Sequence, residues 1–250
     1  RDDTVAFEAF KAGNLSLRRE WDAGKWAGGY NFPAARDGRV AMDELPHGRP
    51  EKVRSFIFNT RRAPFDDIRV RQALNLLFDF DWMNKNIFHG QYKHINSYFP
   101  NSELAAPDAP PPPPNDPRTN MRKANVLLDA AGWTVVKGWR KKDGKPLAFE
   151  IILSAPEDEK IALQFKNALQ KIGVDIQVRL LDSAQYIRRL NEYDYDMTLY
   201  YWLSTLSPGT EQVLYWTCEA AKEPARFNYA GVCDSEIDAL AHQVAQAKDR

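Results

Sequence analysis

The sequence predicts an α/β fold in which crossover helices join the strands of a mainly parallel sheet. From residue 147 to residue 202 the patterns alternate in the order strand, helix, strand, helix, strand. This order is typical of right-handed crossovers onto a parallel sheet and is the main observation behind the fold class. The second observation is the composition, because 250 residues with 44% hydrophobic and 27% charged content are ordinary for a globular protein with a large core.

The elements before this alternating part are less regular. Residues 4–13, TVAFEAFKAG, predict a helix, and residues 20–50 predict loops and short helical pieces because glycine and proline interrupt them. The apolar run VRSFIFNT, residues 53–60, predicts a buried strand. Asp67 then supplies a cap for a helix that runs to Leu77.

A proline-rich connection, NSELAAPDAPPPPPNDPRTN, separates the two parts. Its run of prolines at 110–114 cannot form a helix or a sheet, so an extended polyproline spacer is expected. The alternative is a scaffold role, in which this run recruits a proline-reading partner.

The second part begins with a helix over residues 118–131. A hairpin is predicted in residues 133–154, with its turn at residues 142–144, Lys-Asp-Gly. The remaining elements are predicted as helix 156–172, strand 174–182, helix 183–191 and strand 193–202.

The last predicted strand, YDYDMTLYYW, carries four tyrosines and a tryptophan. Alternation sorts its residues into two faces. The core face is predicted to hold Tyr193, Tyr195, Met197, Leu199 and Tyr201, and the other face Asp194, Asp196, Thr198, Tyr200 and Trp202. Because ligands bind beyond the carboxyl ends of parallel strands, the aromatic end of this strand is either packing or a binding site.

Charge and motifs argue against several classes of protein. Lys+Arg and Asp+Glu both number 34, so no global basic field attracts nucleic acid or an anionic membrane, and only a local cluster would make such contacts. Catalytic serine and nucleotide-binding signatures are absent, so neither an enzyme nor a cofactor is expected. His89 and His94 are the best pair for a metal, and a metal-dependent hydrolase is the rival from another class.

The chain holds two local groups of arginines. Arg61, Arg62, Arg69 and Arg71 are interspersed with Asp66 and Asp67, which favours self-neutralising surface ion pairs over a phosphate track. Arg188 and Arg189 come just before the aromatic strand, where they would either hold a ligand carboxylate or form a solvated helix face.

Cys218 and Cys233 are the two cysteines of the chain. Their number and spacing fit one short disulfide better than a four-ligand zinc site, and two separate buried thiols are the alternative.

Three stretches together carry a resemblance to a known family: FNTRRAPFDDIRVRQALNLLFDFDWMNK, HGQYKHINSYFPNSELAA, and NALQKIGVDIQVRLLDSAQYIRRLNEYDYDM. They resemble the extracytoplasmic solute-binding proteins of peptide-type ABC importers, family 5. The segment from Asn59 to Asn75 is the most recognisable. Residues 97–99, SYF, and 102–106, SELAA, are most similar to the Yej-type branch, which imports oligopeptides and peptide conjugates.

The resemblance implies a two-lobed type II periplasmic-binding-protein-like fold, of which this chain is the second lobe. The lobe that it implies consists of a hinge-side flank (1–52), an α/β core (53–205) and a C-terminal helical flank (206–250). The resemblance also implies a monomer in the periplasm, with a signal peptide outside this sequence, that delivers its ligand to an inner-membrane ABC permease.

The site is carried over from the same resemblance. In relatives the strand matching DYDMTLYYW and the turn after it line the cleft between the lobes. The expected ligand contacts are Tyr200, Tyr201, Trp202, Leu203, Ser204, Thr205, Arg188 and Arg189. The family aspartate that holds a peptide amino terminus is missing from the turn, so an oligosaccharide or opine-like ligand is the rival within the family.

Overall fold

The computed structural model describes residues 3–106 and 115–248, so the predicted proline run lies outside the described residues. The chain divides into two compact units. One comprises residues 1–47 and 80–94, and the other comprises residues 48–79 and 95–250. The three-part division at residues 52 and 205 stays a prediction. The structure groups residues 80–94 with the first 47 residues, although the sequence placed them in the core.

The first unit is a small helical body built around aromatic rings. Its helices are α1 (Asp3–Lys11), the π-helix η1 (Lys25–Gly29), α2 (Pro33–Arg36) and α4 (Phe80–Asn86). Phe7 is buried and its ring meets those of Tyr30 and Phe32 edge-on, with centroids 5.4 and 6.4 Å away. Glycine and proline keep these helices short, as the sequence predicts.

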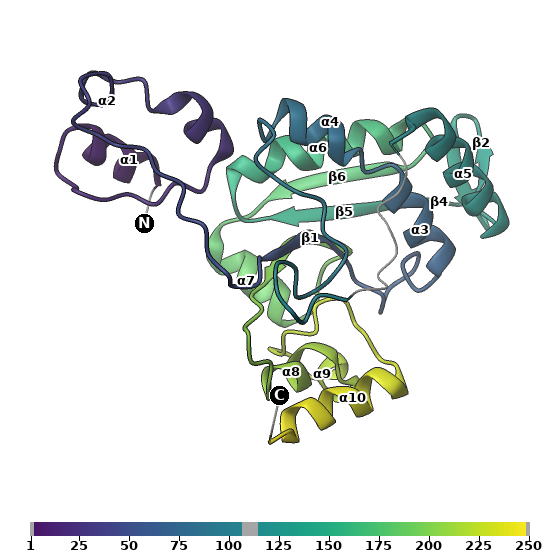
Figure 1. The fold of residues 1–250 in the computed structure, drawn as a ribbon. Coiled ribbons are helices and arrows are strands. Elements are labelled where there is room, and N and C mark those ends of the chain that lie inside the picture. Colours follow the sequence, from purple (N-terminus) through teal and green to yellow (C-terminus); the bar gives the residue numbers. More distant parts are fainter. Residues whose placement is uncertain (1–2, 107–114, 249–250) are drawn as a thin grey trace. The chain divides into compact units, whose positions relative to one another are not determined.

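The second unit contains a four-stranded sheet with the order β1-β7-β5-β6 (Figure 1). Its strands are β1 (Val53–Phe58), β5 (Ala148–Leu153), β6 (Asp175–Leu180) and β7 (Met197–Trp202). β5 runs parallel to both β6 and β7, and β1 runs antiparallel to β7. The predicted mainly parallel sheet is therefore confirmed.

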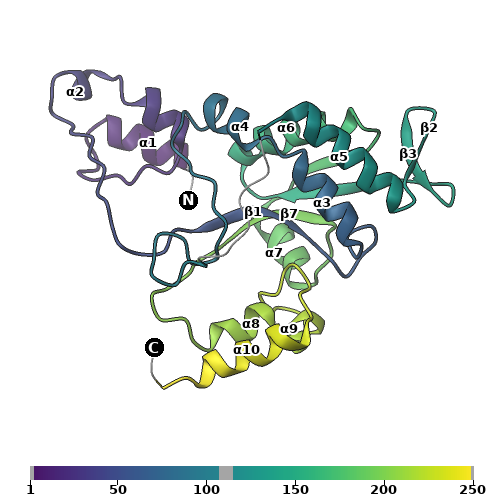
Figure 2. The same cartoon turned by 45° about the vertical axis from the view of Figure 1, so that its right-hand side comes forward.

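The connections turn the centre of this sheet into a topological switch point. The 3-10 helix η2 (Pro156–Asp158) and α6 (Glu159–Gln170) lead from β5 to β6, and α7 (Ser183–Asn191) leads back across β5 to β7. Figures 1 and 2 show α6 and α7 on opposite faces of the sheet, with α3 (Ile68–Leu76) and α5 (Pro117–Ala130) on the α6 side. In this arrangement a ligand-binding crevice is expected at the carboxyl ends of the strands.

Aspartate caps explain where several of these helices begin. The Asp67, Asp116, Asp182 and Asp234 carboxylates each accept a hydrogen bond from an N–H of the first helical turn. Both faces of the sheet are packed under these helices. The core includes Phe65, Val70, Leu74, Leu128, Ile151, Ile152, Phe165 and Leu169.

The predicted hairpin is only half right. Asp143 and Gly144 do form a turn, between β3 (Trp139–Lys142) and β4 (Lys145–Pro146). A second tight turn joins β3 to β2 (Thr134–Val136), giving a separate three-stranded sheet. β5 follows β4 in the chain but belongs to the four-stranded sheet, where most of its side chains are buried.

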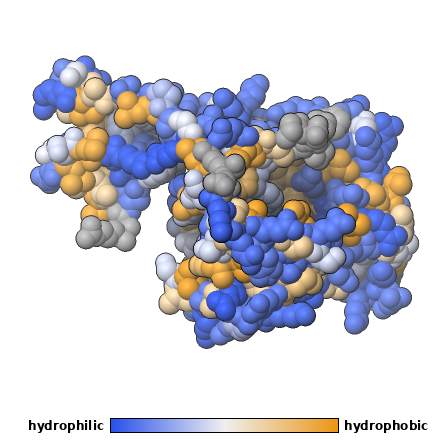
Figure 3. Space-filling view, turned by 60° about the horizontal axis from the view of Figure 1, so that its bottom comes forward, coloured by the Kyte–Doolittle hydropathy of each residue, from blue (hydrophilic) through white to orange (hydrophobic). Residues whose placement is uncertain are grey.

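The C-terminal part consists of α8 (Glu211–Trp216), α9 (Cys218–Lys222) and α10 (Ser235–Gln246). A disulfide joins Cys218 to Cys233, so the predicted pairing is confirmed. Figure 3 shows apolar residues among polar ones on the face that includes these helices. None of the helices in the described ranges is long and apolar enough to cross a membrane.

Candidate functional site

The carboxyl ends of β5, β6 and β7 form one edge of the sheet, and β1 begins at the same edge. Val53 of β1 pairs with Trp202 of β7, and Arg54 pairs with Tyr201. The predicted aromatic residues therefore lie where the switch point places a binding site.

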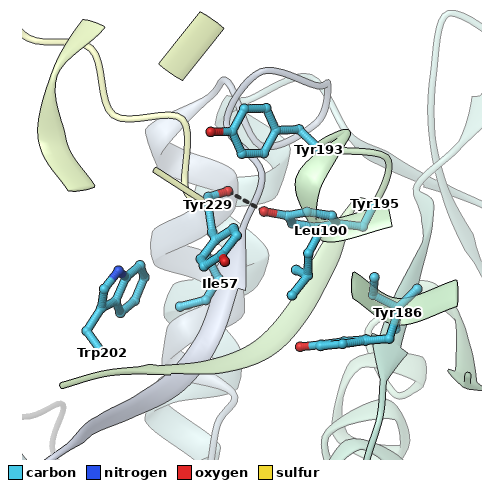
Figure 4. Packing of buried hydrophobic residues seen from close by; sticks show 8 residues of the cluster. Ile57, Tyr186, Leu190, Tyr193, Tyr195, Trp202 and Tyr229 are labelled. Atoms are coloured by element: carbon cyan, nitrogen blue, oxygen red, sulfur yellow. Dashed lines mark hydrogen bonds between the residues drawn. The ribbon is translucent and has the colours of Figure 1, made fainter. Parts of the chain in front are cut away.

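Trp202 is the central aromatic residue of this edge. It is 3% exposed and belongs to a buried cluster with Ile57, Ile152, Tyr186, Leu190, Tyr193, Tyr195 and Tyr229 (Figure 4). The Tyr98 and Trp216 rings lie 5.9 and 5.6 Å from its ring. The Trp202 Nε1 group is buried and has no hydrogen-bond partner among the described residues.

Tyr98 closes over Trp202 from a distant part of the sequence. Its ring also meets the Trp216 ring at 4.8 Å, and the Ser204 hydroxyl donates a hydrogen bond to the Tyr98 carbonyl oxygen. The loop that carries Tyr98 and the turn after β7 are thus tied together at the candidate site.

Tyr200 and Tyr201 stack on each other, with ring centroids 5.5 Å apart. Tyr200 is half-buried against Tyr229, whereas Tyr201 is 44% exposed, with the Lys52 ammonium 4.9 Å from its ring centroid. The turn after β7 is open as well, since Leu203 and Thr205 are exposed. An exposed aromatic ring and an exposed turn therefore lie at this edge.

The predicted faces of the strand need one correction. Tyr193, Tyr195 and Met197 are buried as predicted, but Tyr201 is exposed and Trp202 is buried. Helices cover both faces of the sheet, so alternation separates two covered faces rather than core from solvent. On one face the covering helices end before Tyr201, so its ring is exposed. On the other face Tyr98 and Trp216 extend the cover over Trp202.

An ion pair at the same edge was not predicted. The Arg54 guanidinium of β1 binds the Asp158 carboxylate at the end of η2. Asp158 is buried, and its carboxyl group has a raised pKa. The effect of burial, which raises the pKa, outweighs that of Arg54, which lowers it. The partners come from segments about 100 residues apart in sequence, so no local pattern reveals them.

Hydroxyl groups behind the aromatic edge are fixed by hydrogen bonds. The Tyr186 hydroxyl contacts Thr198 Oγ1 and donates to the Leu199 carbonyl oxygen, both at 3.0 Å, and burial raises the Tyr186 pKa to about 12. The Tyr195 hydroxyl donates to the Tyr229 carbonyl oxygen at 2.6 Å (Figure 4). These hydrogen bonds hold the two phenol rings in place behind the aromatic edge.

Arg188 and Arg189 lie at the opposite edge of the sheet. α7 runs antiparallel to the strands, so its last turn lies near the amino end of β7, where Arg189 binds Glu150 and Asp194. Arg188 is exposed on the same turn. The structure therefore does not bring these arginines to the aromatic site, and proximity in sequence was misleading because the strand extends away from them.

The other arginine group matches the prediction only in part. Arg69 pairs with Asp67 at 2.7 Å as predicted, but Arg62 pairs with Asp194 at 2.9 Å and Arg71 donates to the Phe65 carbonyl oxygen at 2.6 Å. Arg61 differs, since its guanidinium binds the carbonyl oxygens of Ala221 and Asn228 and lies 3.7 Å from the Tyr193 ring centroid. It joins the end of β1 to the disulfide-bonded segment.

The two candidate metal ligands belong to the first unit. His94 packs edge-on against Phe80, with centroids 5.2 Å apart. Within residues 3–106 and 115–248, no group of three histidine, cysteine, aspartate or glutamate side chains is placed to hold a metal ion. The hydrolase alternative gains no support from this geometry.

Residues 1–223 match the model for the middle part of bacterial extracellular solute-binding proteins, family 5. The chain is 40% identical to protein y4wM of Sinorhizobium fredii over 282 residues, covering 100% of this chain and 42% of that protein. It is 32% identical to the probable peptide-binding protein YejA of Agrobacterium fabrum, covering 100% of this chain and 46% of that protein.

A solved structure shares the fold. The oligopeptide-binding protein AppA of Bacillus subtilis, in complex with a nonapeptide, superposes with a TM-score of 0.76 at 20% identity. The match covers 100% of this chain and 48% of AppA. The chain thus spans less than half the length of these relatives.

Proposed function

The chain belongs to family 5 of the bacterial extracellular solute-binding proteins, and from this premise we propose that it helps to bind an extended peptide or peptide conjugate for an ABC importer. The similarity to a probable peptide-binding protein of Agrobacterium fabrum supports this class of ligand. We further propose that the longer protein works as a periplasmic monomer and passes its ligand to an inner-membrane permease. Catalysis has no part in this function.

The observation that carries the proposal is the aromatic edge at the switch point. Tyr201 is exposed there, the turn after β7 is open, and the buried Trp202 Nε1 donor has no hydrogen-bond partner within residues 3–106 and 115–248. Extended peptides bind through main-chain N–H and C=O groups, which every sequence offers. Aromatic walls then tolerate varied side chains. Tyr200, Tyr201, Trp202, Leu203, Ser204 and Thr205 are therefore kept as the proposed ligand contacts.

The turn after β7 offers no carboxylate that would hold the amino terminus of a peptide ligand. Residues 203–207, LSTLS, contain no carboxylate. The nearby Asp158 carboxylate already binds Arg54. We therefore expect that a free amino group contributes little to binding by this part of the protein.

Calorimetry with matched peptides tests the function. The longer protein is expected to bind an extended peptide. It should bind the same peptide with an acetylated amino terminus with an affinity that differs by no more than about threefold. The chain alone is expected to bind both more weakly than micromolar, because closure of two lobes supplies much of the ligand burial. The peptide class is wrong if the longer protein binds an oligosaccharide or opine-like compound and no peptide.

A further inference from the structure

The small sheet of β2, β3 and β4, which we call the basic ribbon (residues 134–146), has no part in the candidate site. Figures 1 and 2 show β2 and β3 beyond the end of α5, apart from the four-stranded sheet. A ribbon of this size is marginal in water unless another element supports it.

Arg140 anchors the ribbon to the rest of the second unit. The side chain is 1% exposed, and its guanidinium donates to the Ile172 carbonyl oxygen at 3.0 Å and to Asp129 Oδ1 at 2.7 Å. The Arg140 backbone N–H donates to the Gly173 carbonyl oxygen at 2.8 Å. A Cβ atom on Gly173 would lie 2.8 Å from the Gly138 oxygen, so only glycine permits this approach. The ribbon is therefore held rigidly at its base.

The outward face of the ribbon carries an exposed apolar pair. Val136 of β2 lies directly opposite Trp139 of β3, and each is 43% exposed. Val135 on the other face is 56% exposed. A rigid support thus displays a tryptophan and two valines to solvent.

Lysines predominate among the charged residues of the ribbon. Apart from the anchored Arg140, the charged residues of the ribbon are Lys137, Lys141, Lys142, Lys145 and a single acidic residue, Asp143. The ribbon is therefore a local basic surface on a chain whose basic and acidic residues are equal in number overall.

Two of these lysine positions are unfavourable for the ribbon itself. Lys142 lies directly opposite Lys145, and like charges in that position destabilise paired strands, although the Lys142 ammonium also donates to the Ala131 carbonyl oxygen at 3.0 Å. Lys137 has a φ of 52° in a two-residue turn, where asparagine, aspartate or glycine is preferred. A residue such as Lys137, which breaks a local rule without an evident structural gain, commonly marks a functional surface.

The kind of cation indicates the partner. Protein interfaces are enriched in arginine and depleted in lysine, whereas every exposed cation of the basic ribbon is a lysine. Lysine suits diffuse attraction to anionic headgroups, and tryptophan is favoured at the membrane–water interface. We propose that the basic ribbon is a peripheral docking surface for anionic phospholipid, with Trp139 and Val136 entering the headgroup layer. This does not depend on which ligand the protein binds.

Vesicle sedimentation tests the proposal. The chain is mixed with vesicles of phosphatidylcholine alone or of phosphatidylcholine with phosphatidylglycerol, at low and physiological salt. We expect binding to the anionic vesicles only, weakened by salt because headgroup attraction is screened. A triple variant, K137Q/K141Q/K145Q, should lower the partition coefficient about a hundredfold, since each lysine near an anionic surface contributes about fivefold.

The matched control neutralises three exposed lysines elsewhere in the second unit, K123Q/K160Q/K222Q. This variant has the same net charge as the first and should bind anionic vesicles within about threefold of the unmodified chain. Circular dichroism shows whether each variant is folded. The proposal is overturned if the chain binds neither type of vesicle, if both variants lose binding equally, or if the ribbon lysines matter only for capture by an acidic protein.

Discussion

The two edges of the four-stranded sheet are built from different chemistry. At the amino edge, Arg62 and Arg189 bind Asp194, and Arg189 also binds Glu150. At the carboxyl edge, Tyr98, Trp202 and Trp216 pack together, while Tyr201 remains exposed. The charges of the amino edge are paired with one another, whereas the carboxyl edge exposes the Tyr201 ring and holds a buried Trp202 Nε1 donor that has no hydrogen-bond partner among the described residues.

This difference separates support from binding. Charges that are satisfied within the chain have little left to offer a ligand, so the amino edge is expected to contribute stability alone. The carboxyl edge combines a buried aromatic cluster with the exposed Tyr201 and an exposed turn. Substitutions at the two edges should therefore change different measured quantities.

The largest effect is expected at Trp202. Because its ring is buried among Tyr98, Tyr200 and Trp216, replacement by alanine should lower the free energy of unfolding by about 3–5 kcal/mol. Urea denaturation of the chain measures this loss. Trp139→Ala, at an exposed tryptophan, is the control and should change stability by less than about 0.5 kcal/mol.

Trp202→Phe then separates packing from hydrogen bonding. It keeps an aromatic ring but removes the Nε1 donor, so in the longer protein it should weaken peptide binding more than it weakens folding. Unchanged peptide affinity in that variant would show that the partnerless donor does not face the ligand.

The next effect concerns the segment behind the aromatic edge. The disulfide closes a loop with a sequence separation of 15, and reducing it should lower stability by about 3 kcal/mol. Tyr229 lies within this loop and packs on Tyr200, so its loosening should also uncover the aromatic edge. Urea denaturation with and without a reductant measures the change, and a C218S/C233S variant should not respond to the reductant.

A smaller effect is expected at the amino edge. Arg189→Ala leaves the half-buried Glu150 without this partner and should lower stability by about 2 kcal/mol, with unchanged ligand affinity in the longer protein. Arg188→Ala, on the exposed neighbouring residue, is the matched control and should have little effect. A loss of affinity confined to Arg189→Ala would break the proposed separation of the two edges.

The smallest effect is the pH dependence of the α3 cap. Hydrogen bonding to Arg69 lowers the Asp67 pKa to about 2 in the folded chain, below its unfolded value of about 3.9. The ionised cap therefore stabilises the fold above about pH 4, and this contribution is lost as the pH falls towards 2. Asp67→Asn should cost about 1 kcal/mol at pH 7, after allowing for solvent screening. Thermal melts at pH 7 and pH 2.5 should differ less in the variant than in the unmodified chain.

Strong local signals made most of the fold predictable. Regular helices such as 118–131 and strands such as 53–60 carry their own periodicity, and aspartates and glycines mark their ends. The main error was the hairpin in residues 133–154, because a second tight turn at Lys137 and Gly138 looks like ordinary loop sequence. The aromatic part of the candidate site is predicted in the same way, since an aromatic cluster at a strand end is visible locally.

The sequence by itself determined the family, the order of strands and helices, and the aromatic end of β7, because each depends on residues close together in the chain. Only the tertiary structure decided which of those aromatic residues are exposed. Tyr98 and Trp216 cover Trp202 from distant segments, and Arg54 pairs with Asp158 across the sheet edge. Only the structure placed Arg189 at the amino edge. Because α7 runs antiparallel to β7, Arg189 lies near the start of β7 and far from the aromatic residues at its end.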